Sequence, residues 1–88
     1  MKGSADEALK TELKQLIVDE SDKDIDPLSI GDDDALFGEE STIALDSLDA
    51  IQLSMAIQKT YGIKITDSKE ARRAFATVNS LADLIQPG

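Results

Sequence analysis

Ser47 is the residue whose type and setting first suggest chemistry. It stands in Leu45-Asp-Ser-Leu-Asp49, where a polar segment gives way to apolar residues with helical spacing. In the first turn of a helix, backbone N–H groups point outward and the helix dipole favours an anion. Either Ser47 is one of the polar residues common at helix starts, or its hydroxyl carries a phosphate ester there, which Asp46 and Asp49 would partly oppose.

The composition argues against a hydrolase built on this serine. The chain has no histidine and no cysteine, so the usual Ser-His and Cys-His pairs are excluded. Disulfides and zinc sites made of Cys and His are excluded for the same reason. Eighteen acidic residues against nine basic ones give a formal charge of −9. This charge repels nucleic acids and anionic membranes and favours partner proteins with basic surfaces.

A calcium-binding loop is a second chemistry to consider. Asp22, Asp24 and Asp26 alternate as at the start of an EF-hand loop. The sixth position of such a loop requires glycine but holds Pro27, and the twelfth holds Asp33 instead of glutamate. We therefore expect a solvated acidic loop and no dedicated metal site.

The length predicts a single domain over residues 1–88. We expect residues 1–4 to be a tag or disordered and residues 86–88 to form a tail. No apolar run is long enough to span a membrane, and the N-terminus lacks a signal-peptide core. We expect a cytoplasmic monomer that does not insert into membranes.

Capping residues and apolar spacing predict an all-α fold, a small bundle of three main helices plus one short helix. Ser4 and Glu7 have the spacing of a capping box for the first helix. Asp46, Asp67 and Thr77 are the expected caps of the other three. The expected helices cover about residues 5–19, 47–61, 67 to 72 or 74, and 77–85.

A long acidic loop separates the first two helices. From Glu20 to Leu45 the helical periodicity disappears, and Pro27, Gly31 and Gly38 interrupt the chain. A connection of this length in a small domain is commonly functional or held by a few apolar anchors. The expected anchors are Ile30, Leu36 and Phe37.

The second helix, which Gly62 is expected to end, carries two apolar stripes. At about 100° per residue, the core-facing stripe consists of Ala50, Leu53, Ile57 and Tyr61. The second stripe, roughly 150° away, consists of Leu48, Ile51 and Met55. One interpretation is that the helix is buried on both sides. The other is that so small a bundle cannot cover both stripes, which leaves the second stripe exposed as a partner surface.

The sequence around Ser47 resembles the acyl carrier protein family. The likeness rests on Leu45-Asp-Ser-Leu-Asp49, on Ala50-Ile-Gln-Leu-Ser-Met-Ala-Ile57 and on Tyr61-Gly-Ile-Lys-Ile65, and it extends from the first helix to Ile85. In that family the serine carries 4′-phosphopantetheine, transferred from coenzyme A by a separate enzyme that needs magnesium. The thiol of this arm holds acyl groups as thioesters. The resemblance implies a non-catalytic carrier with the arm on Ser47.

The resemblance also implies roles for residues around the serine, and it implies partners. The implied partner-recognition residues are Asp46, Leu48, Asp49, Ile51, Gln52 and Met55. The acyl-pocket candidates are Phe37, Leu53, Ile57, Phe75 and Leu81. The implied partners are a phosphopantetheinyl transferase, which holds the magnesium, and acyl-loading ligases or synthases with basic surfaces. Their pathways would be fatty-acid, lipid or polyketide-type synthesis.

Departures from the family pattern favour a specialised carrier. Ala44 stands where the family usually has glycine, and the loop between Phe37 and Ser47 is a little longer than typical. The second helix of fatty-acid carriers is usually rich in glutamate, but here the matching places hold Gln52, Gln58 and Lys59. Since exposed charges govern partner choice, we expect standard fatty-acid enzymes to recognise this carrier poorly.

Two other functions stay open. A D-alanyl or aminoacyl carrier shares the Gln-Leu pattern of the second helix, although such carriers typically follow the serine with a bulky apolar residue and then glycine, where this chain has Leu48-Asp49. A helical adaptor with no prosthetic group would have the same fold and the same exposed stripe. It would leave Ser47 unmodified.

Overall fold

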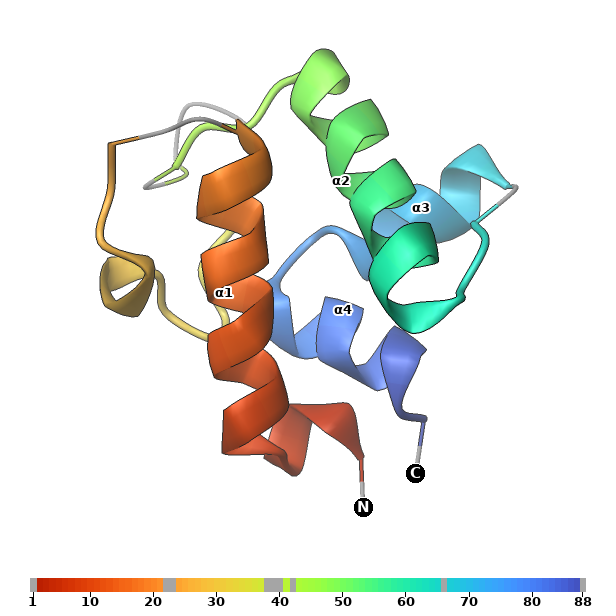
Figure 1. Cartoon of the computed structure of the whole chain (residues 1–88), viewed down its shortest axis with the longest axis horizontal. Coiled ribbons are helices and arrows are strands. Elements are labelled where there is room, and N and C mark those ends of the chain that lie inside the picture. Colours follow the sequence, from red (N-terminus) through yellow and green to blue (C-terminus); the bar gives the residue numbers. More distant parts are fainter. Residues whose placement is uncertain (1, 22–23, 38–40, 42, 66, 88) are drawn as a thin grey trace.

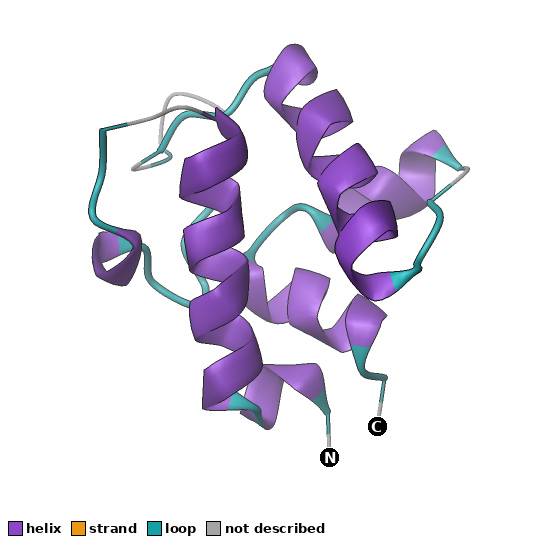
Figure 2. Cartoon of the chain, viewed as in Figure 1, coloured by secondary structure: helices purple, strands orange, loops and turns teal. Residues whose placement is uncertain are grey.

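The computed structural model describes residues 2–21, 24–37, 41, 43–65 and 67–87 of the chain, and within these it contains helices and loops but no strand (Figures 1 and 2). The four α-helices are α1 (Glu7–Ser21), α2 (Ser47–Tyr61), α3 (Ser68–Ala74) and α4 (Val78–Ile85). Two short 3₁₀ helices, η1 (Gly3–Ala5) and η2 (Pro27–Ser29), were not expected. The predicted all-α fold, with three main helices and one short one, is confirmed.

Helix α2 begins and ends where its sequence predicts. The Asp46 carboxylate accepts the N–H of Asp49 at 3.0 Å, and the Asp49 carboxylate accepts the N–H of Asp46 at 3.1 Å. This reciprocal capping box fixes the first turn. Gly62 ends the helix with a φ of 72°, in the left-handed region that glycine adopts without steric cost, and donates to the Gln58 carbonyl at 2.9 Å.

The caps of α3 and α4 are also confirmed. Asp67 accepts the N–H of Lys69 at 3.0 Å, and the Thr77 hydroxyl accepts the N–H of Ser80 at 3.1 Å. These side chains supply acceptors for N–H groups that the first helical turn leaves without partners. None of the helices in the described ranges has the length and hydropathy that a membrane crossing requires.

The predicted cap of the first helix is wrong. Helix α1 begins at Glu7, and the Asp6 carboxylate, not the Ser4 hydroxyl, accepts the N–H of Leu9 at 3.2 Å. Ser4 belongs to η1, and its N–H donates to Asp83 of α4 at 2.9 Å. This bond lowers the pKa of the Asp83 carboxyl from its usual value. The capping role passes to Asp6 because Ser4 lies inside η1, and Asp6 is the residue between η1 and α1.

Residues 2–4 belong to the segment that we expected to be a tag or disordered, and η1 begins at Gly3 of this segment. Gly3 donates its N–H to the Gln86 carbonyl at 2.7 Å, which ties the two ends of the chain together, as Figure 1 shows. A Cβ added at Gly3 would collide with the carbonyl oxygen of Ala82. Only glycine therefore permits η1 to approach α4 this closely. Met1 lies outside the described residues.

The core lies between α1, α2 and α4 and is closed on one side by the connection before α2. Its fully buried side chains include Leu13, Ile17, Leu53, Ile57, Val78 and Leu81. Of the predicted loop anchors, Ile30 and Leu36 are fully buried, whereas Phe37 is half-buried against the core. Leu36 donates to the Ala76 carbonyl at 3.1 Å and accepts from Leu45 at 2.9 Å. The connection is thus bound to both neighbouring segments.

Two lysines of α1 hold the acidic loop in place. Lys10 and Lys14 each approach a different carboxylate oxygen of Asp32 at 2.8 Å, and we name these three residues the lysine clamp. Lys10 is only 4% exposed. Hydrogen bonding to Lys10 and Lys14 lowers the pKa of the Asp32 carboxyl, and the same bond to Asp32 raises that of the Lys10 ammonium. The Asp32 carbonyl also accepts the N–H of Asn79 at 3.0 Å, which links α1, the loop and α4.

Candidate functional site

Ser47 is the first residue of α2 and is exposed. The Asp46–Asp49 capping box fixes the backbone on both sides of it. The serine is therefore held at a helix N-terminus, where the dipole favours an anion. An enzyme that approaches from solvent can reach its hydroxyl.

The second apolar stripe of α2 is exposed beside Ser47. The exposed fractions are 69% for Leu48, 58% for Ile51 and 66% for Met55. The alternative that α2 is buried on both sides is therefore wrong. Gln52 is exposed beside this stripe. At the N-terminal end of α2, Asp46 is exposed and Asp49 is half-buried. All six predicted partner-recognition residues thus gather on one end and one side of α2.

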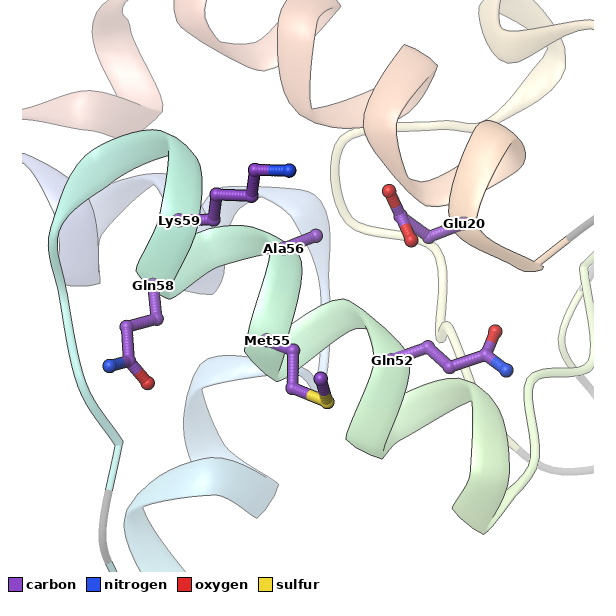
Figure 3. A pocket seen from close by; sticks show the side chains of 6 residues that line it. All are labelled: Glu20, Gln52, Met55, Ala56, Gln58 and Lys59. Atoms are coloured by element: carbon purple, nitrogen blue, oxygen red, sulfur yellow. The ribbon is translucent and has the colours of Figure 1, made fainter.

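A groove of about 570 Å³ lies along α2 toward the end of α1. In Figure 3, the Glu20 carboxylate at the end of α1 extends toward α2, and Ala56 and Lys59 point toward α1. Met55, which belongs to the exposed stripe, lines the same groove. The exposed stripe therefore borders a groove whose rim carries one acidic and one basic side chain.

A cavity of about 780 Å³, which we name the serine cavity, lies directly beside Ser47. Helix α2 contributes Ser47, Ala50 and Ile51 to its lining, and α3 contributes Ala71 and Arg72. Most of the lining is apolar; besides the α2 residues it includes Phe37, Leu45, Ala71 and Phe75. The charged residues of the lining are Asp46 and Arg72. The cavity can accept an elongated, largely apolar group attached near the serine.

The structure separates the predicted acyl-pocket residues into two groups. Phe37 and Phe75 line the serine cavity. Leu53, Ile57 and Leu81 are almost fully buried in the core among α1, α2 and α4 and do not line it. The helical wheel identified the inward face of α2 but not which inward residues pack against α1 and which face α3.

Sequence reasoning missed the α3 side of the serine cavity. Ala71, Arg72 and Ala76 line it, together with Ala35 from the acidic loop. The i, i+4 spacing of Ala71 and Phe75 was the available signal for an inward face on α3.

Ala44 adopts a φ of 50° just before the site, in the left-handed region. The structure thus retains a glycine-like backbone at the position where the resembling family usually has glycine. The Ser41 hydroxyl accepts the N–H of Ile43 at 3.2 Å and that of Ala44 at 3.0 Å, which holds this turn in place. Non-glycine residues pay roughly 1–2 kcal/mol for this conformation.

The described part of the acidic loop offers no cluster of three or more metal-ligating side chains. Asp26 instead caps η2 by accepting the N–H of Leu28 at 3.0 Å. Asp22, the first position of the EF-hand-like spacing, lies outside the described residues.

Comparison with known proteins agrees with these features. The family described as "Phosphopantetheine attachment site" matches residues 11–85. The chain is also similar to "Acyl carrier protein 1, chloroplastic" of Casuarina glauca, with 36% identity over 61 residues. That match covers 67% of this chain and 43% of the relative, so it spans less than half of the relative's length. The chain therefore belongs to the phosphopantetheine-attachment family, and it is a non-catalytic carrier of the acyl carrier protein type that bears a covalently attached 4′-phosphopantetheine.

Proposed function

We propose that Ser47 carries the 4′-phosphopantetheine arm and that the protein delivers acyl groups, held as thioesters on the arm, to partner enzymes. The observation that supports this proposal most strongly is the position of Ser47. It is exposed at the start of α2, between an exposed apolar stripe and an apolar cavity. The residues present fit a group attached through a phosphate, because the helix N-terminus favours an anion there. The thiol that holds the acyl group comes with the arm, since the chain has no cysteine.

The exposed stripe is the proposed docking surface for partners. Leu48, Ile51 and Met55 offer apolar contact area, and methionine adapts its shape to different partners. Asp46, Asp49 and Gln52 surround this area with acidic and polar groups. A partner with a basic rim and an apolar centre would be complementary in both respects.

The proposed pathway is fatty-acid, lipid or polyketide-type synthesis, in a specialised branch. The relative is named an acyl carrier protein, which supports an acyl cargo. Gln52, Gln58 and Lys59 occupy positions where glutamates would attract the basic surfaces of standard enzymes, which supports dedicated partners. A D-alanyl or aminoacyl cargo remains the alternative. A cytoplasmic location remains a prediction for this chain, whereas the name of the relative describes that protein as chloroplastic.

The attachment site is tested by intact mass. The chain is incubated with coenzyme A, magnesium and a broad-specificity phosphopantetheinyl transferase, beside Ser47→Ala and Ser54→Ala. We expect the wild type and Ser54→Ala to gain one phosphopantetheine and Ser47→Ala to gain none. Ser54 is a matched control because it belongs to the same helix. Modification of Ser47→Ala would refute the assignment.

The pathway is tested with the loaded arm. Loading rates are compared for a housekeeping fatty-acid acyltransferase, a candidate dedicated acyl ligase and a D-alanine ligase. A specialised acyl carrier predicts fast loading only by the dedicated acyl ligase. Comparable rates with the housekeeping enzyme would contradict specialisation, and preferential D-alanine loading would replace the acyl cargo with the aminoacyl one.

A further inference from the structure

Basic residues are concentrated in one part of this acidic chain. Residues 59–73 hold five basic side chains against two acidic ones, whereas the whole chain holds 9 against 18. Two of the five, Arg72 and Arg73, occupy the last turn of α3. Of the five, Arg72 is the one that lines the serine cavity.

Arg72 stands at this cavity together with Ser47. Both residues line it, one from α3 and one from α2, whereas the neighbouring Arg73 does not. In the described part of the chain, Lys10 forms ion pairs with Glu7 and Asp32, and Lys14 forms one with Asp32. Arg72 takes part in none of these ion pairs. Arg72 is thus an exposed cationic residue in the lining of an otherwise largely apolar space.

A phosphodiester on Ser47 would place a permanent negative charge at this cavity. The other charged group there, the Asp46 carboxylate, already accepts the N–H of Asp49 at 3.0 Å. Guanidinium groups bind phosphate oxygens through paired N–H donors more effectively than an ammonium does. The chemistry of the two groups and their shared cavity make them natural partners.

We propose that Arg72 pairs with the phosphodiester on Ser47 and thereby holds the pantetheine arm in the serine cavity, against Phe75 and Ala71. This inference rests on the proposed attachment at Ser47. Because Arg72 is exposed and exposed ion pairs are weak and screened by salt, the pair biases the arm toward the cavity without fixing it there. A partner that offers its own groups to the phosphate can therefore draw the arm out.

The test uses the modified protein without an acyl group, in which the phosphodiester is the anion that the arm introduces. Backbone NMR signals of both Ala71 and Phe75, the methyl signal of Ala71 and the ring signals of Phe75 are compared before and after modification. The comparison covers the wild type, Arg72→Ala, Arg72→Lys and Arg73→Ala. We expect the modification-induced shifts in Arg72→Ala to fall about two- to fivefold, as for loss of an exposed ion pair. They should be intermediate in Arg72→Lys and unchanged in Arg73→Ala.

Arg73→Ala is the matched control because both arginines lie in the last turn of α3. The positive charge of each therefore interacts favourably with the helix dipole. The phosphodiester ³¹P signal should move in Arg72→Ala and not in Arg73→Ala, and raising NaCl from about 50 to about 500 mM should shrink the wild-type shifts. Shifts in Arg72→Ala equal to those of the wild type would overturn the inference and leave the attachment intact. Failure of the wild type to gain the arm would overturn both.

Discussion

The starts of the two long helices differ in how far the rest of the molecule covers them. At the start of α1, η1 is bonded to α4, and Lys10 is buried against Asp32. At the start of α2, the polar groups are satisfied locally by the capping box, but Leu48 and Ile51 remain exposed and a cavity opens alongside. Each large apolar side chain left exposed forgoes roughly 1.5–3 kcal/mol of burial energy. The comparison assigns stability to the first region and binding to the second.

The largest expected contrast lies within α2 itself. Ile57→Ala should lower the free energy of unfolding by about 2–5 kcal/mol, because Ile57 is fully buried and its loss leaves a cavity. Ile51→Ala should change it by less than about 0.5 kcal/mol, because Ile51 is 58% exposed. Urea denaturation measures both. The assignment of stability and binding fails if Ile51→Ala is as destabilising as Ile57→Ala.

A smaller loss is expected where η1 meets α4. Gly3→Ala should cost about 1–3 kcal/mol, since the new methyl group would collide with the Ala82 carbonyl and η1 must move away. The exposed neighbour Ala5→Ser is the control and should be close to neutral. Thermal unfolding of both variants checks this. An unchanged midpoint for Gly3→Ala would show that η1 contributes little to the stable region.

The lysine clamp should make stability depend on pH at both extremes. The pKa of Asp32 is lowered from 3.8 in the folded state, so its contribution is present above that value and lost as the pH falls through the folded pKa. The pKa of Lys10 is raised from 10.5, so its contribution is present below that value and lost as the pH rises through the folded pKa.

Asp32→Asn should therefore unfold at a lower temperature than the wild type near pH 7, and the difference should shrink below pH 3.8 and above pH 10.5. Asp24→Asn removes the same formal charge from an exposed site and serves as the control. Parallel melting curves across the pH range are the measurement. A difference that stays constant in acid would contradict the clamp.

The smallest expected effect is a gain. Ala44→Gly should stabilise the protein by about 0.5 kcal/mol, because relief of the left-handed strain slightly exceeds the greater flexibility of glycine in the unfolded chain. Ala8→Gly, on the exposed surface of α1, should instead cost about 1 kcal/mol. Chemical denaturation compares the two. Equal losses in both variants would show that the φ of Ala44 carries no strain.

The sequence predicted features that depend on nearby residues. Asp46 and Gly62 bound α2 as expected because capping involves groups within one turn of the chain. The helical period also predicted the second stripe of α2, but it left open whether this stripe is buried or exposed. The cap at Ser4 failed because Ser4 lies in η1, which is bonded to the distant α4, so that α1 begins only at Glu7.

The candidate site was predictable in part for the same reason. Ser47 and its neighbours are consecutive, so their placement follows from the start of one helix. The roles of Leu53 and Arg72 depend on how α2 and α3 are rotated against the other helices, which only tertiary packing sets. The periodicity of one helix shows which of its faces is apolar but not which helix covers that face.

The most direct test of the central claim is to locate the added mass by fragmentation. Trypsin cleavage after Lys23 and Lys59 releases residues 24–59 as one peptide, which also contains the competing hydroxyl residues Ser29, Ser41, Thr42 and Ser54. We predict that after treatment with the transferase the phosphopantetheine is found on Ser47 alone. Its presence on another of these residues, or its absence from the peptide, would contradict the assignment of Ser47, at the start of α2, as the attachment site.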